Sequence, residues 1–146
     1  MGLSAALESF QAIGDRRWTA RSHLSIAGLY RSRGEWAIAR QHLDAALDAF
    51  RAISDGPAEA RALRELGMLL RDQGDSAGAG TALGASQAIF ETLGDMLWKA
   101  RVLFSQAILD ERRGQNPEPV MNEATAISRQ QGIASEEKIA SALREW

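Results

Sequence analysis

Residues 27–50 read AGLYRSRGEWAIARQHLDAALDAF, with Gly34 between two runs of small and apolar residues. In each run these residues recur every three or four positions, which puts them on one face of an α-helix. A glycine just past such a run is typical of a left-handed residue that ends a helix. The stretch therefore predicts a helix, a tight turn and a second helix.

The same arrangement returns at a shift of forty residues. Three copies of the pattern share identical residues without a gap, namely Phe10, Phe50 and Phe90; Asp15, Asp55 and Asp95; Ala20, Ala60 and Ala100; Arg21, Arg61 and Arg101; Leu29, Leu69 and Leu109; and Gly34, Gly74 and Gly114. A fixed period of about 20 to 50 residues is the signature of stacked repeats, because each unit covers the open apolar face of its neighbour. We therefore expect an all-α fold, a right-handed α-α superhelix (solenoid) of about three helix pairs with a half-unit at each end.

The register predicts one repeat domain over 1–146. Its parts are a half-repeat at 1–14, repeats at 15–54, 55–94 and 95–134, and a closing helix at 135–146. The predicted helices span about 3–13, 16–32, 36–53, 56–72, 76–93, 96–112, 118–131 and 136–145. Helices are expected to stop at Gly14, Ser54 and Gly94, and an aspartate follows each stop as the N-cap of the next helix: Asp15, Asp55 and Asp95.

Composition limits the possible functions. The chain is 45% hydrophobic and 25% charged with a net charge of −2, which argues against disorder and against a general nucleic-acid or anionic-membrane binder. It has no cysteine and two histidines, which excludes a thiolate nucleophile, a disulfide framework and a cysteine-based zinc site. No stretch reaches the roughly 18 apolar residues of a membrane span, so a cytoplasmic protein is favoured. The glycine-rich segment 76–86 lacks the lysine of a phosphate loop, and no cofactor is expected.

The residues around Gly34 carry a family resemblance. Ala27, Tyr30 and Ala39 stand seven before, four before and five after this glycine, and the second unit repeats the pattern with Gly67, Leu70 and Ala79. This spacing resembles the tetratricopeptide repeat. The third unit departs from it at Asp110, Pro119 and Glu123. Each unit is longer than the usual 34 residues, which is similar to the long variant of bacterial regulatory proteins and signalling adaptors.

The resemblance implies a non-enzymatic scaffold that binds proteins or peptides and has a regulatory or signalling role. It also implies that the first helix of each pair lines a concave surface. Six arginines stand on the predicted face, with apolar residues between them: Arg21, Leu24, Arg31, Arg61, Arg64, Met68, Arg71, Arg101, Phe104 and Ile108. Since arginine can hold a carboxylate with two parallel hydrogen bonds, we expect a basic groove for an acidic, partly apolar segment.

An alternative interpretation of these arginines stays open. They could instead pair with acidic neighbours such as Glu59, Glu65 and Asp72, in which case the groove would carry little free charge. The carboxylate clamp known in this family needs lysine and asparagine at positions held here by Leu24, Gly28 and Glu65. A chaperone-tail receptor is therefore not expected.

The predicted ends of the solenoid support a second function. Apolar residues stand on both end helices: Leu3, Leu7 and Phe10 at one end, and Ile139, Leu143 and Trp146 at the other. Solenoid ends normally carry a polar cap. These faces therefore indicate either a piece of a longer protein or a structural self-assembly module that forms a homo-oligomer through its ends.

Catalytic and metal-binding patterns are missing from the sequence. There is no nucleophile elbow, no HExxH motif and no carboxylate pair that the fold would bring together. His23 takes a position held by leucine in the other units, where one hydrogen bond is a better expectation than a metal ion. We expect no enzymatic activity and no metal site.

Overall fold

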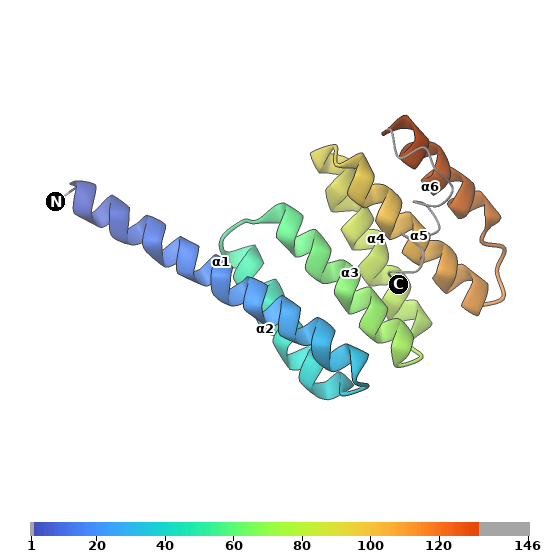
Figure 1. Cartoon of the computed structure of the whole chain (residues 1–146), viewed down its shortest axis with the longest axis horizontal. Helices are drawn as coiled ribbons and strands as arrows, with labels where there is room; N and C mark the ends of the chain where they lie inside the picture. Colours follow the sequence, from blue (N-terminus) through green and yellow to red (C-terminus); the bar gives the residue numbers. More distant parts are fainter. Residues whose placement is uncertain (1, 132–146) are drawn as a thin grey trace.

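The computed structural model describes residues 2–131, with the side chains of Glu8 and of residues 12–131. Six helices follow one another in this range: α1 (Gly2–Ser32), α2 (Trp36–Ala52), α3 (Gly56–Asp72), α4 (Ser76–Leu93), α5 (Met96–Arg112) and α6 (Glu118–Gln130). Residues 2–131 contain no strand. The expected all-α helical solenoid is confirmed (Figure 1).

The helices form antiparallel pairs that stack on one another. Within the pairs, α1 packs against α2, α3 against α4 and α5 against α6. Between the pairs, α2 packs against α3 and α4 against α5. Each second helix therefore covers the first helix of the next pair, which is the arrangement that a repeating apolar face requires.

Helix ends follow the predicted chemistry. Gly34, Gly74, Gly94 and Gly114 all have positive φ angles, and Ser54 is the single non-glycine residue between 2 and 131 that does. The carboxylates of Asp55 and Asp95 accept hydrogen bonds from the backbone N–H groups of Ala58 and Trp98, so both predicted N-caps are confirmed. Asp75 caps α4 in the same way. These ends set where each helix starts and therefore which side chains face inward.

The predicted break at Gly14 is wrong. Residues 2–32 form one continuous helix, in which Gly14 keeps a negative φ and Asp15 is an interior residue rather than an N-cap. No heavy atom would lie within 4 Å of a Cβ on Gly14, so no neighbouring element forces a turn there. The N-terminal half of α1 projects past the other helices (Figure 1). With no packing partner to favour a turn, continued backbone hydrogen bonding is the better arrangement.

Small residues let the paired helices approach closely. A Cβ built on Gly67 in α3 would lie 2.8 Å from Cγ of Leu83 in α4, which is closer than side-chain atoms pack. In the same pair, the buried Ser86 hydroxyl donates a 2.7 Å hydrogen bond to the carbonyl oxygen of Ala60. The family pattern of small residues thus has a direct packing reason in this pair.

Some expectations fall outside the described residues. The closing helix at 135–146, with Ile139, Leu143 and Trp146, lies there, as do the side chains of Leu3, Leu7 and Phe10. The boundaries of the repeats stay predictions. None of the helices between residues 2 and 131 has the length and apolar character that crossing a bilayer would take.

Candidate functional site

The first helices of the three pairs lie next to one another. In addition to the contacts within pairs, α1 contacts α3 and α3 contacts α5. This layer carries the arginines predicted to line a groove. Their surroundings place five of the six in two groups, one around Asp72 and one around Trp98, while Arg21 belongs to neither.

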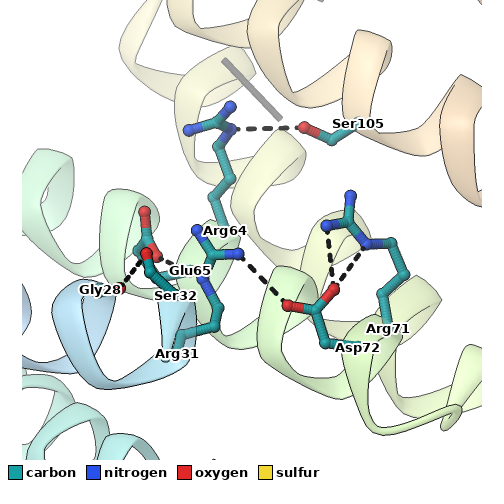
Figure 2. Close-up of polar contacts among 8 residues, drawn as sticks. All are labelled: Gly28, Arg31, Ser32, Arg64, Glu65, Arg71, Asp72 and Ser105. Atoms are coloured by element: carbon teal, nitrogen blue, oxygen red, sulfur yellow. Dashed lines mark hydrogen bonds and ion pairs between the residues drawn. The ribbon is translucent and has the colours of Figure 1, made fainter. Parts of the chain in front are cut away.

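Arg31 and Arg71 belong to a network of ion pairs that joins α1 to α3 (Figure 2). Nη1 of Arg31 donates to Oδ2 of Asp72 over 3.3 Å, and its Nε lies 3.5 Å from Oε2 of Glu65. Nη2 of Arg71 donates to the other oxygen of Asp72 over 3.0 Å. The interpretation in which arginines pair with Glu65 and Asp72 is therefore correct for this part of the layer.

Arg71 is also too buried to contact another protein. Its side chain is 6% exposed, and burial lowers the pKa of its guanidinium, while the hydrogen bond to Asp72 acts in the opposite direction. A buried guanidinium needs such a partner because an unpaired charge in the interior is costly. Arg71 thus contributes to the folded structure rather than to an open surface.

The second group of arginines gathers around the indole ring of Trp98. The guanidinium carbon of Arg61 lies 4.5 Å from the ring centroid, that of Arg101 4.7 Å and that of Arg64 5.9 Å. All three distances fall within the range of a cation–π interaction. Helices α3 and α5 therefore present three positive charges around one aromatic ring.

Two contacts hold Trp98 in place. Its backbone N–H donates to the Asp95 carboxylate that caps α5, and its ring stacks on Phe90 of α4 at a centroid distance of 5.5 Å. Trp98 therefore packs across the junction between the second and third helix pairs. The gathering of arginines on it was not expected from the sequence, although Arg61 and Arg101 occupy the same position in the repeat register.

The charges around Trp98 are only partly compensated. Arg64 donates from Nε to the Ser105 hydroxyl over 3.3 Å (Figure 2). Among the residues that the structure describes, no carboxylate forms an ion pair with Arg61 or Arg101. Arg61 is exposed and Arg101 is half-buried. Arg61, Arg64, Trp98 and Arg101 form what we call the Trp98 cluster, and in it the guanidinium groups of Arg61 and Arg101 are the ones that could receive an anion.

The remaining predicted residues are spread more widely. Arg21 is exposed in α1 and lines an open hollow of about 400 Å³ beside Trp18. Leu24 is half-buried against the core between α1 and α2, and Ile108 is half-buried in α5. These three residues lie on first helices and are not members of the Trp98 cluster.

Met68 and Phe104 do not line a groove. Both are buried, each with 2% of its surface exposed, and Phe104 packs in the core cluster with Ala124 and Ile127 of α6. Large apolar side chains gain free energy by leaving water wherever neighbouring helices allow it. The expectation that these two residues would contact a peptide is therefore corrected.

The two histidines meet, although they are nineteen residues apart in the sequence. Nδ1 of His23 lies 2.9 Å from Nδ1 of His42, and the His42 ring stacks on Tyr30. The expectation of one hydrogen bond to His23 is confirmed, but its partner was not foreseen. In the described part of the chain, no group of three or more histidine, aspartate or glutamate side chains is arranged to hold a metal ion.

Comparison with known proteins agrees with this architecture. No curated protein matches the sequence. The pattern of the tetratricopeptide repeat matches residues 18–92, which is more than half of the chain and includes α2, α3, nearly all of α4 and the C-terminal part of α1 from Trp18 onward. Repeats of this kind generally mediate protein–protein interaction or act as scaffolds. On the repeat register, the stacked helix pairs and this match, the chain belongs to the tetratricopeptide repeat family.

Proposed function

We propose that this protein is a binding module that takes an acidic, partly apolar segment of another protein along its first helices, with the Trp98 cluster as the main subsite. The observation that carries the proposal is the convergence of Arg61, Arg64 and Arg101 on one ring, where Arg61 and Arg101 form no ion pair with a carboxylate of the described residues.

The geometry favours a carboxylate-bearing partner. Stacking on an aromatic ring restricts a guanidinium group while leaving its N–H edge open, so less entropy is lost when a carboxylate binds. Hydrogen bonds between charged groups are about twice as strong as neutral ones. Since the chain as a whole has a net charge of −2, attraction for an anion is local to this cluster.

Apolar contacts of the partner would fall beside the charges. Leu24 and Ile108 are half-buried and keep part of their surface open, whereas Met68 and Phe104 are unavailable. Arg21 extends the basic surface along α1. Arg31 and Arg71 are excluded from the binding surface in this proposal, because Asp72 already compensates their charge. Such a module would serve as the recognition part of a cytoplasmic regulatory or signalling system.

The test is a comparison of two labelled peptides by fluorescence anisotropy. One peptide alternates glutamate with leucine and phenylalanine, and the other carries glutamine in place of every glutamate. We expect the acidic peptide to bind at least about tenfold more tightly, with affinity falling between about 50 and about 300 mM NaCl as the charges are screened. Equal affinity for both peptides would refute the proposal.

Variants locate the binding surface. Arg61→Gln combined with Arg101→Gln should weaken binding of the acidic peptide by about tenfold or more, since two charge-assisted hydrogen bonds are lost. The matched control is Arg33→Gln, which removes an exposed charge in the turn after α1. If the control weakens binding as much as the double variant does, the Trp98 cluster is not the subsite.

A further inference from the structure

The face of α1 that bears Trp18 and Leu29 is uncovered, although its counterparts in α3 and α5 are buried. Leu69 and Leu109 are 1% and 0% exposed, whereas Leu29, at the same position of the register, is 51% exposed. Ser22 is likewise exposed where Ala62 and Val102 are fully buried. In the later pairs, this face is covered by the second helix of the preceding unit.

Trp18 shows the same contrast most clearly. Trp18 is 71% exposed, whereas Trp98, the equivalent residue two repeats later, stacks on Phe90 of the preceding second helix. An open hollow of about 400 Å³ lies beside Trp18, lined also by Arg21, Ser22, Ser25 and Ile26. An uncovered tryptophan and leucine on one helix face are unusual in a free surface and mark an interaction site.

The chain contains a segment that matches the missing cover. Residues 3–15 read LSAALESFQAIGD, and residues 43–55, which run from α2 into the following turn, read LDAALDAFRAISD. The two stretches have leucine, phenylalanine and isoleucine at the same positions. Residues 43–52 lie in α2, which packs on α3. By sequence, then, residues 3–13 are the second helix that should pack on residues 16–32.

That segment cannot cover its own chain. Because residues 2–32 form one uninterrupted helix, residues 3–13 extend away from the face that they match (Figure 1). They are nevertheless placed to cover the same face in a second molecule. Exchange of an identical element between protomers costs little, since the contacts resemble those that a single chain would make.

We propose that two copies of this chain pair through α1 as antiparallel helices, each supplying residues 3–13 to cover Trp18, Ser22 and Ser25 of the other. In the third pair, Phe90 stacks on Trp98. If position 10 of one copy lies opposite Trp18 of the other in the same way, the two antiparallel helices cross midway between positions 10 and 18, at Gly14. Positions 3, 7, 10, 14, 18, 25 and 29 follow one another at helical spacing and therefore share one face of α1. Glycine at the crossing point allows close approach of the two backbones.

The oligomeric state tests the proposal first. Sedimentation equilibrium between about 10 and about 200 µM should give twice the 15.9 kDa mass of one chain. Trp18→Ala should raise the dissociation constant of the dimer by about tenfold or more, whereas Trp36→Ala, which changes an exposed tryptophan of α2, should leave it unchanged. A monomer throughout this range, or equal effects of the two variants, overturns the proposal.

A cysteine placed at the crossing point distinguishes this dimer from any other. The sequence contains no cysteine, so Gly14→Cys introduces a single thiol in each copy. Under mild oxidation it should form a disulfide dimer, because the two copies of position 14 face each other across the two-fold axis. Ile38→Cys, at an exposed site on α2, is the control and should form far less of the disulfide dimer. Disulfide formation no faster than that of the control would rule out pairing through α1.

Discussion

Nη1 of Arg31, near the end of α1, donates a 3.3 Å hydrogen bond to Oδ2 of Asp72, the last residue of α3. The other oxygen of the same carboxylate accepts from Arg71, which is nearly buried. One carboxylate therefore compensates two arginines from adjacent helix pairs. This contact helps to set how the first pair sits on the second.

Asp72→Asn should destabilise the fold by about 2–4 kcal/mol, because it removes the carboxylate that pairs with the buried Arg71 and with Arg31. Urea denaturation followed by circular dichroism measures this change. Asp44→Asn is the control, since Asp44 pairs with Arg40 on the exposed surface of α2 and should cost less than about 0.5 kcal/mol. Similar losses in the two variants would mean that the Asp72 network contributes no more than an ordinary surface pair.

Gly67→Ala and Gly84→Ala should change stability in opposite directions. At Gly67 the new methyl group would meet Leu83 at 2.8 Å, so we expect a loss of about 1–3 kcal/mol. Gly84 lies in α4, is exposed and has no atom near the new Cβ, so alanine should stabilise by up to about 1 kcal/mol through its helix propensity. Thermal unfolding of both variants gives the comparison. A stable Gly67→Ala variant would show that Leu83 can move aside.

Trp98→Leu should cost about 1–3 kcal/mol in urea denaturation, because it removes the stack on Phe90 and the surface on which the arginines lie. A double-mutant cycle with Arg61→Gln should give a coupling energy of about 0.5–1 kcal/mol, as expected for a partly exposed cation–π contact. Trp36→Leu in the same cycle with Arg61→Gln serves as the uncoupled control. Purely additive effects for Trp98 and Arg61 would contradict the role of the ring in holding the guanidinium.

The histidine pair should be replaceable by the residues of the next unit. His23 and His42 correspond in the register to Leu63 and Ala82, which are both buried. The double variant His23→Leu with His42→Ala should therefore fold with a stability within about 1 kcal/mol of the original, whereas His42→Ala alone leaves His23 without its 2.9 Å hydrogen bond and should cost more. Guanidinium chloride unfolding of the original protein, the double variant and the single variant measures these differences in stability. A double variant less stable than the single one would assign the pair a structural role that the apolar residues cannot fill.

Much of the fold could be predicted from local sequence signals. The positive φ angles at Gly34, Gly74 and Gly114 and the N-caps at Asp55 and Asp95 were expected, because each depends on residues within one turn of the chain. The helix ranges from α2 to α6 agree with the predicted ones to within a residue or two. Local hydrogen bonding, which short sequence patterns encode directly, explains this agreement.

The candidate site could be predicted only in part. The sequence identified the arginines of the first helices, since a forty-residue register places them in the same positions. It could not determine which of them would be compensated, because Asp72 reaches Arg31 and Arg71 only after α1 and α3 pack together. Nor could it foresee that Arg61 and Arg101 would meet at Trp98, a contact that joins two units.

The sequence by itself determined the repeat, the family and the ends of most helices, since these depend on spacing along one chain. Only the tertiary structure decided that α1 continues through Gly14, that Phe104 is buried, and that Arg71 pairs with Asp72 while Arg61 pairs with no carboxylate of the described residues. Each of these outcomes depends on whether a neighbouring helix is present to cover a face or supply a carboxylate. Burial and charge compensation are properties of packed helices rather than of a single segment, and this is the physical reason for the difference.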